Sequence, residues 1–240
     1  MLLKVDGLSI RFGGVAALSE VSFEIEEGRV TGLIGPNGAG KTTCFNCITR
    51  LYQPTSGSIT FAGDDLLQIP AYRVARRGIA RTFQNLELFT SMTVLDNVLV
   101  GIAARPANRV TRQDEIREAR ELLAYVGLAD AADAPVRRLP FGARKMVELA
   151  RALAAKPKLL LLDEPAAGFG HEETGRLADT ISRVNRDFGT TILMVEHQMQ
   201  LVMGVCDHIV VLSSGRKLAE GNPAAISQNK SVIEAYLGTL

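Results

Sequence analysis

The chain has 240 residues, of which 47% are hydrophobic, and its 27 basic and 26 acidic side chains give a formal net charge of +1. This length and composition suffice to bury a full-sized core, as one domain or as a domain with an inserted lobe. The balanced charge gives no reason to expect nucleic acid as a partner. No apolar run approaches the roughly 18 to 20 residues that span a bilayer, and the first ten residues are too charged for a secretory signal, so we expect a soluble chain.

The three cysteines are an odd number for a chain of this length, which indicates a reducing compartment rather than a disulfide framework. Cys44 and Cys47 form a C-x-x-C pair inside a stretch whose apolar spacing suits a helix. No second cysteine or histidine cluster stands near the pair to complete a metal site. We interpret the pair as two packed thiols.

Short apolar runs alternate with helical patterns along much of the chain. A helix is predicted from about Lys41 to Leu51, and another from Glu172 to Phe188. The alternation favours a largely parallel sheet with crossover helices. The predicted strands are residues 21–28, 29–35, 57–63, 158–163, 190–197 and 208–221.

The middle of the chain, from Asn85 to Pro157, has a helical pattern throughout. Thr111 and Asp114 have the spacing of a capping box before an apolar stripe. We therefore predict an α/β fold in a single domain over residues 1–240, with a core of residues 1–84 and 158–240 and a helical lobe of residues 85–157. The stripe consists of Ile116, Ala119, Leu122, Leu123 and Val126.

The strongest chemical signal is "GPNGAGKTT", which satisfies the phosphate-loop pattern between a predicted strand and a predicted helix. Its glycines leave room for backbone N–H groups to converge on phosphate oxygens at the helix N-terminus. Lys41 is expected to bind the β and γ phosphates of ATP, and the Thr42 hydroxyl to ligate Mg²⁺. The candidate nucleotide-binding residues here are Gly35, Pro36, Asn37, Gly38, Ala39, Gly40, Lys41, Thr42 and Thr43.

Two acidic residues, Asp163 and Glu164, end the leucine-rich strand "KLLLLDEP". Parallel-sheet proteins bind their ligands at this end of their strands. Beside a phosphate loop, Asp163 is expected to hold the Mg²⁺ shell and Glu164 to polarise the attacking water as general base. Without that loop, the pair would as readily be a strand cap and the start of a turn.

Gln84 and His197 are further candidates for the same site. Gln84 lies where the core passes into the predicted lobe, so its amide could reach metal or water, and we count it as a metal ligand and a catalytic residue. His197 ends a predicted strand, where a polar side chain can meet the γ-phosphate. His171 and His208 are interpreted as structural.

The order of these motifs resembles that of ABC transporter ATPases over nearly the whole chain. Phe12 in "RFGGVAAL" resembles the A-loop, "GPNGAGKTT" Walker A, "TFQN" the Q-loop and "LPFG" the signature. "LLLLDEP" resembles Walker B, "AAGFGHEET" the D-loop and "VEHQM" the switch-histidine segment. "NCITRLYQPTSG", "RTFQNLELFTSMTVLDNV", "LDEPAAGF" and "VIEAYLG" resemble, more narrowly, the ATPase subunits of branched-chain amino acid importers.

The resemblance implies a P-loop NTPase core with a mostly parallel sheet and an antiparallel β subdomain, plus the inserted helical lobe. It also implies a head-to-tail dimer of identical or homologous ATPase subunits that sandwiches two ATP molecules, with Phe12 and Gly142 as nucleotide contacts. Permease segments would dock between core and lobe, near Gln84 and the segment that carries Phe89, Met92 and Val94. Those last three side chains could equally be lobe core.

Two further expectations follow from the resemblance to an importer ATPase. A periplasmic or extracellular substrate-binding protein would act through the permease. The subunit itself would be cytoplasmic and peripheral on the inner face of the cell membrane.

The signature-like segment departs from the usual L-S-G-G-Q. Pro140 stands in place of the serine and removes a hydroxyl donor, and Ala143 stands in place of the glutamine. The helix start should persist, because proline preorganises the first turn and Gly142 keeps its N–H near an incoming phosphate. Arg144 and Lys145 are favourable to nucleotide phosphate by their charge. With Gly170 at a usually polar D-loop position, we predict a weakened clamp that still works.

Other functions remain open at this point. The ATPase of another transporter, such as a lipopolysaccharide exporter, is similar in length and motif order. A soluble ABC-type ATPase of DNA repair or translation would usually carry tandem nucleotide domains, coiled-coil insertions or basic arms, none of which the sequence has. A P-loop kinase would leave the inserted lobe, the signature-like helix and the switch histidine without explanation.

Overall fold

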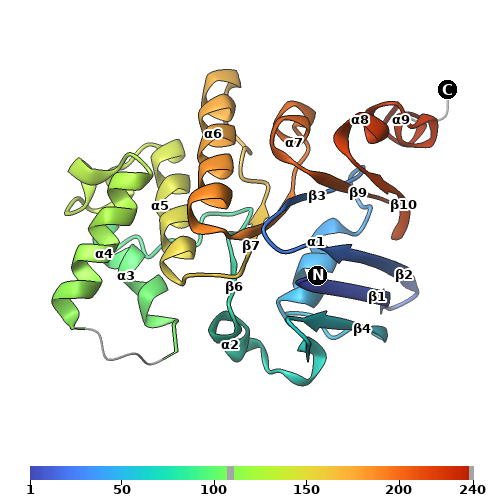
Figure 1. Cartoon of the computed structure of the whole chain (residues 1–240), viewed down its shortest axis with the longest axis horizontal. Helices are drawn as coiled ribbons and strands as arrows, with labels where there is room; N and C mark the ends of the chain where they lie inside the picture. Colours follow the sequence, from blue (N-terminus) through green and yellow to red (C-terminus); the bar gives the residue numbers. More distant parts are fainter. Residues whose placement is uncertain (107–110, 238–240) are drawn as a thin grey trace.

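The computed structural model describes residues 1–106 and 111–237, and it contains two sheets and an all-helical region (Figure 1). The six-stranded sheet has the order β10-β9-β3-β8-β7-β6, with every pair parallel except β9 and β10. Its strands are β3 (Val30–Ile34), β6 (Ile79–Arg81), β7 (Leu159–Asp163), β8 (Thr191–Val195), β9 (His208–Ser213) and β10 (Arg216–Gly221). The predicted largely parallel sheet is confirmed.

The second sheet is antiparallel and has the order β2-β1-β4-β5. Its strands are β1 (Leu3–Phe12), β2 (Val15–Ile25), β4 (Ser56–Phe61) and β5 (Asp64–Asp65). The fold class, with a parallel core sheet and an antiparallel subdomain, is therefore confirmed. β1, β5 and β6 were not predicted as strands.

Helices connect and cover the strands. They are α1 (Lys41–Ile48), α2 (Ala71–Val74), α3 (Val94–Ala103), α4 (Arg112–Tyr125), α5 (Phe141–Ala154), α6 (His171–Phe188), α7 (Met199–Val205), α8 (Pro223–Ser227) and α9 (Lys230–Leu237). Short 3-10 turns are η1 (Leu66–Gln68), η2 (Ala75–Arg77), η3 (Ala129–Ala131) and η4 (Val136–Arg138). Within the ranges that the structure covers, no helix is both long and apolar enough to span a bilayer.

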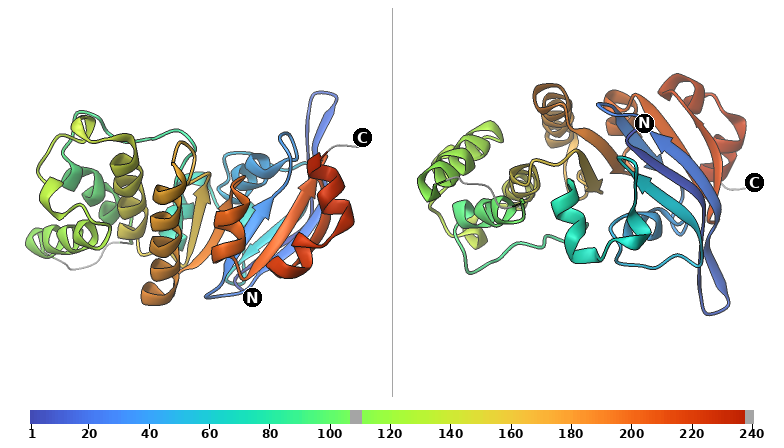
Figure 2. Two further views of the ribbon diagram at one scale, coloured as in Figure 1. Left: turned by 90° about the horizontal axis from the view of Figure 1, so that it is seen from above. Right: turned by 60° about the horizontal axis from the view of Figure 1, so that its bottom comes forward.

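The helical lobe consists of α3, α4 and α5, which follow β6 and precede β7 in the chain. These helices lie together at one end of the molecule in the views of Figures 1 and 2. The Thr111 hydroxyl accepts from Asp114 N at 3.2 Å, as predicted for a cap, although the Asp114 carboxylate accepts from the Thr111 hydroxyl instead of completing the box. Ala119, Leu122 and Leu123 of the predicted stripe are buried.

The parallel sheet separates two hydrophobic cores, because alternate side chains of a strand point to opposite faces. In β7, Leu160 and Leu162 join the core beneath the lobe helices, α6 and α7. Leu159 and Leu161 join the core that α1 shares with the antiparallel sheet. Because β7 packs into both cores, its carboxyl end, which carries Asp163 and Glu164, is held between the lobe side and the antiparallel-sheet side of the molecule.

Candidate nucleotide site

The phosphate loop runs from the end of β3 into α1, and two of its glycines are required by geometry. Gly35 has φ 148°, and a Cβ there would lie 2.0 Å from the Leu212 carbonyl oxygen. Gly40, the N-cap of α1, has φ 100°, and a Cβ there would lie 2.6 Å from Leu18 Cδ2. The loop can therefore pass closely against its neighbours only with glycine at these positions.

Lys41 opens α1 and is 6% exposed. Its ammonium donates to the carbonyl oxygens of Gly35 at 2.8 Å and Pro36 at 2.9 Å. Burial lowers the pKa of Lys41, while the Glu164 and Asp163 carboxylates oppose this shift. The cation is thus held inside the loop, with the acidic strand end as its counter-charge.

A cavity of about 200 Å³ lies over the loop. Seven consecutive residues of the predicted phosphate loop, from Asn37 to Thr43, line it. Glu164 and His197 line it as well, from the ends of two other strands, and Ala17 contributes from β2. The structure therefore brings the phosphate loop, Glu164 and His197 to one cavity, whereas Asp163 does not line it.

Glu164 is the centre of a hydrogen-bonded cluster of the three predicted catalytic side chains. Gln84 Nε2 donates to Glu164 Oε2 at 2.9 Å, and His197 Nε2 lies 2.8 Å from Glu164 Oε1. The Glu164 backbone has φ 49°, in the left-handed region that side chains with a Cβ rarely adopt. The carboxylate is thereby aimed along the sheet edge, between the two neighbouring strand ends.

Asp163 is 2% exposed and pairs with a residue that the sequence analysis did not single out. Arg81 Nη2 lies 2.7 Å from Asp163 Oδ2, while Arg81 Nη1 donates to Asn46 Oδ1 at 2.7 Å. The Arg81 guanidinium also lies over the ring of Phe83, 4.8 Å from its centroid. Asp163 Oδ1 is buried and has no hydrogen-bond partner among the residues that the structure describes.

Glu196 is a second residue that sequence reasoning missed. It is 2% exposed, and its carboxylate accepts from the backbone N–H groups of Ala166 at 2.8 Å, His197 at 2.6 Å and Gln198 at 2.9 Å. These bonds fix the turn that carries His197. An acidic residue directly before the predicted histidine was the available signal.

Phe12 lies at the end of β1, is 47% exposed, and meets Tyr52 edge-on with ring centroids 5.1 Å apart. It does not line the 200 Å³ cavity. Phe12 belongs to the same antiparallel sheet as Ala17, which does line the cavity.

The signature-like segment lies away from this cavity. Pro140 is the N-cap of α5. Gly142, in the first turn, packs beside the loop that precedes α6: a Cβ on Gly142 would lie 3.4 Å from a ring carbon of Phe169. Pro140, Gly142 and Ala143 line a separate cavity of about 540 Å³. Gly170 is the N-cap of α6, with its N–H bonded to Glu173 Oε2 at 3.0 Å.

Lys145, whose charge is favourable to nucleotide phosphate, is buried against its own chain. Lys145 is 5% exposed, and its ammonium donates to the Glu164 carbonyl oxygen at 3.0 Å. The face of α5 that carries Lys145 packs on the end of β7, so the side chain is enclosed by its own chain. Arg144 is partly buried.

The other side chains named from the sequence lie outside the nucleotide cavity. Cys44 and Cys47 are buried free thiols, and burial raises the pKa of Cys47 to about 11, which confirms packed thiols. Val94 is lobe core, whereas Phe89 is 47% and Met92 38% exposed. His171 begins α6, and His208 lies 3.9 Å from Glu220.

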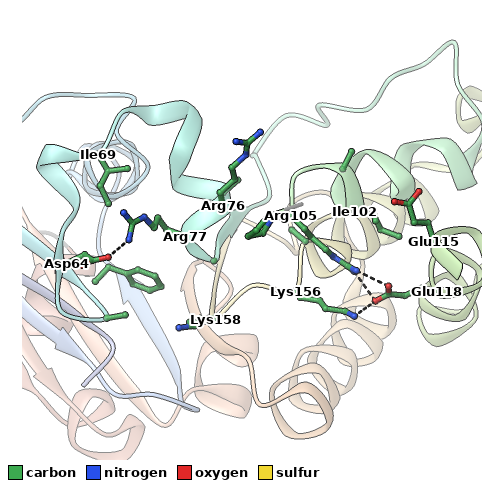
Figure 3. Close-up of a pocket in the computed structure, with 17 residues that line it drawn as sticks. Asp64, Ile69, Arg76, Arg77, Ile102, Arg105, Glu115, Glu118, Lys156 and Lys158 are labelled. Carbon is green, nitrogen blue, oxygen red and sulfur yellow. Dashed lines mark hydrogen bonds and ion pairs between the residues drawn. The ribbon is translucent and has the colours of Figure 1, made fainter. Parts of the chain in front are cut away.

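A cavity of about 810 Å³ lies between the lobe helices and the part of the core that contains η2 and the end of β4 (Figure 3). On the lobe side, Glu118 holds both Arg105 at 2.8 Å and Lys156 at 2.7 Å. On the core side, Arg77 pairs with Asp64. Basic side chains outnumber acidic ones in its lining, which includes Asp64, Arg76, Arg77, Arg105, Glu115, Glu118, Lys156 and Lys158.

A phosphate loop, an acidic strand end and an inserted helical lobe together define a P-loop nucleotide-binding protein of the cassette type. Residues 18–167 match the family model described as ABC transporter. The chain belongs to the ABC transporter family, and it is an ATP-hydrolysing subunit of that family. Residues 216–239 match a second model, described as branched-chain amino acid ATP-binding cassette transporter.

Full-length relatives and solved structures agree with this assignment. The chain is 41% identical to the high-affinity branched-chain amino acid transport ATP-binding protein BraF of Pseudomonas aeruginosa, over 99% of this chain and 98% of the relative. It is 43% identical to the protein LivG of the same description from Salmonella typhimurium, with the same coverage. The ADP conformation of the cassette MJ1267 superposes with a TM-score of 0.90 at 29% identity, covering 99% of both chains.

Proposed function

We propose that this subunit powers the import of branched-chain or related amino acids, with Glu164 as the general base of ATP hydrolysis. The observation that supports this most directly is the cluster of Gln84, Glu164 and His197 at the mouth of the phosphate-loop cavity. A carboxylate in this place can take a proton from an attacking water, while the amide and imidazole orient water and γ-phosphate.

Nucleotide binding is assigned to the phosphate loop. Backbone N–H groups of Gly35, Asn37, Gly38, Ala39 and Gly40, with Thr43, would surround the phosphates, and Lys41 would neutralise them; Pro36, which has no N–H, would only shape the loop. Phe12 would stack on the base, since aromatic faces bind flat apolar rings well. Displacing the Lys41 ammonium from the carbonyls of Gly35 and Pro36 onto phosphate oxygens requires only a side-chain movement.

Mg²⁺ fits the residues present. Magnesium prefers hard oxygen ligands and usually keeps some waters and phosphate oxygens. The Thr42 hydroxyl, the Gln84 amide oxygen and Asp163 supply such oxygens, and the buried Oδ1 of Asp163 has no partner in the described part of the chain. The ion would neutralise charge on the phosphates.

Pairing of two subunits accounts for the position of the signature-like segment. Gly142 and the first turn of α5 lie apart from the phosphate-loop cavity of their own chain. In a head-to-tail dimer they would close the nucleotide site of the partner, with backbone N–H groups and the helix dipole supplying the contact. The partner would be an identical or homologous ATPase subunit.

The permease would contact the cleft between core and lobe. Phe89 and Met92 are exposed on the segment that follows Gln84, and the 810 Å³ cavity of Figure 3 separates the same two parts of the molecule. A permease segment that fills such a cleft would sense the movement of the lobe. In this proposed arrangement the subunit would lie at the cytoplasmic face of the membrane, and a substrate-binding protein would act on the opposite side.

The amino acid cargo is inferred from relatives that are described as high-affinity branched-chain amino acid transport proteins and match this chain from end to end. Co-purification with the tagged subunit should recover a permease, and proteoliposomes of that complex should take up leucine, isoleucine or valine when ATP is inside. Uptake of none of these, with a lipid-exporting partner recovered instead, would contradict the proposal.

Dimer formation and the general base are tested together by Glu164→Gln. This substitution should abolish turnover while leaving ATP binding intact, so ATP and Mg²⁺ should convert monomer to dimer in analytical ultracentrifugation. Nucleotide binding without self-association would assign the partner role to a different ATPase subunit. Wild-type turnover in the variant would overturn the assignment of Glu164.

A further inference from the structure

Glu164, the general base of the proposed function, stands in a backbone conformation that needs external support. Its φ of 49° lies in the left-handed region, where the Cβ crowds the carbonyl. Such conformations persist only when the surrounding contacts over-determine them, and they occur often at active sites. The contacts that hold the Glu164 backbone therefore help to orient its carboxylate.

The backbone of Glu164 is held from both sides. Its N–H donates to the Val195 carbonyl at 2.9 Å, which ties it to β8. Its carbonyl oxygen accepts from Ala167 N at 3.1 Å, within the following turn, and from Lys145 Nζ at 3.0 Å. Lys145 is the contact in this set that comes from the helical lobe.

Lys145 is built into the interior as a charged donor. It is 5% exposed, and its ammonium lies 5.6 Å from the centroid of the Phe141 ring, on the same helix. Burial lowers the pKa of Lys145, and the carboxylates of Glu148, Glu196, Glu164 and Asp163 oppose this shift. Burying a lysine costs folding free energy unless its charge has partners. The Glu164 carbonyl oxygen is such a partner for the Lys145 ammonium.

The same face of α5 also holds the segment that carries Gln84. Residues three apart lie on one helix face, and Lys145, Glu148 and Arg151 follow this spacing. Glu148 Oε1 accepts from Phe83 N at 3.0 Å, and Arg151 Nη1 donates to the Glu87 carbonyl at 2.5 Å. Side chains of α5 thus hydrogen-bond to the backbone before Gln84, to the backbone after it, and to the backbone of Glu164.

We propose that Lys145 is a positioning residue for hydrolysis: its ammonium holds the Glu164 carbonyl and so keeps the Glu164 carboxylate directed at Gln84 and His197. The helix that begins with the signature-like turn is thereby connected directly to the base of its own chain. Movement of the lobe would change the aim of Glu164 as well as the position of Gln84. This inference rests on the proposed role of Glu164.

Lys145→Met tests the proposal in the full-length protein, because it keeps the length of the buried side chain and removes the donor. Turnover at saturating MgATP should fall at least tenfold, with KM for ATP changed less than twofold. Lys145→Arg, which can still donate to the carbonyl, should recover most of the turnover. Lys217→Met, which breaks a pair with Glu220 on β10, is the matched control and should leave turnover unchanged.

Amide hydrogen exchange supplies a readout that does not depend on activity. In Lys145→Met, exchange should increase in the peptide covering residues 163–167 and stay unchanged along α5. An increase throughout α5, with KM rising as turnover falls, would show a purely structural role and overturn the proposal, as would unchanged turnover. If Lys145→Met does not fold, Lys145→Leu, which also lacks a donor, is measured in the same way. Glu164→Gln tests the role of Glu164 as general base separately. Failure of that role and failure of the positioning role of Lys145 are therefore distinguished by different variants.

Discussion

The phosphate-loop end and the signature end of this subunit differ in how many of their functional groups are already in contact within one chain. At the phosphate-loop end, Lys41, Gln84, Glu164 and His197 contact one another or the loop directly within a single chain. At the signature end, the first turn of α5 follows Pro140 and presents backbone N–H groups with no side-chain oxygen from Pro140 or Ala143. The catalytic side chains are therefore already in contact within one chain, whereas closure of the proposed ATP sandwich would depend on backbone contacts alone at Pro140 and Ala143.

The largest expected effect on turnover comes from removing a side chain at the phosphate-loop end. His197→Ala removes the group that lies 2.8 Å from Glu164 Oε1, so turnover should fall by roughly 100-fold, the lower range for acid–base groups. ATP binding should change little, because the phosphate loop is untouched. Single-turnover hydrolysis and an ATP binding titration measure the two quantities.

His208→Ala is the control for this change, since His208 begins β9, at the opposite end of the parallel strands from His197, and lies 3.9 Å from Glu220. It should hydrolyse ATP at the wild-type rate. Equal losses in both variants, or an active His197→Ala protein, would contradict a contribution of His197 to the site.

A smaller effect, in the direction of gain, is expected at the signature end. Ala143→Gln adds an amide donor in the first turn of α5, beside a cavity of about 540 Å³ that has room for it. A hydrogen bond to a charged group contributes about 1.5 to 3 kcal/mol, so hydrolysis by the assembled transporter should rise up to roughly tenfold. Ala143→Leu adds similar bulk without a donor and should give no gain. An unchanged rate in Ala143→Gln would show that the clamp is not limited by this position.

The same contrast explains what the sequence could predict. The phosphate loop and the acidic strand end were predictable because their chemistry is local: glycines, a lysine and carboxylates at fixed spacing. β1 was missed because its apolar alternation changes phase at Gly7, where the pairing with β2 shifts register between Val5 and Leu8. β6 has only three residues, too few for a period to be visible.

Long-range pairings were not predictable. Arg81 lies 82 residues before Asp163, and a single arginine on a short strand carries no signal of its partner. The contact of Lys145 with the Glu164 carbonyl was not predictable either, because helix position fixes the face of a residue but not what that face packs against. In each case the packing of the lobe against the sheet decides the contact, and that packing is a property of the whole fold.

The smallest predicted effect concerns the stability of the lobe at low pH. Hydrogen bonds from Arg105 and Lys156 lower the pKa of Glu118 from 4.5 to about 2. Because the folded pKa lies below the unfolded one, this carboxylate stabilises the fold above pH 4.5, and the contribution is lost as the pH falls toward 2. Its side chain is 26% exposed, so we expect about 1 to 2 kcal/mol rather than the full value of the shift.

Glu118→Gln should therefore lower the free energy of unfolding at pH 7 by that amount and flatten its fall between pH 5 and pH 3, as measured by urea denaturation. Glu172→Gln, which removes an exposed pair with Arg176, should change stability by less than about 0.5 kcal/mol. Parallel pH curves for wild type and Glu118→Gln would contradict the prediction. A flattened curve would show that acid weakens the lobe through the ion pairs of Glu118 with Arg105 and Lys156, on the lobe side of the cavity of Figure 3.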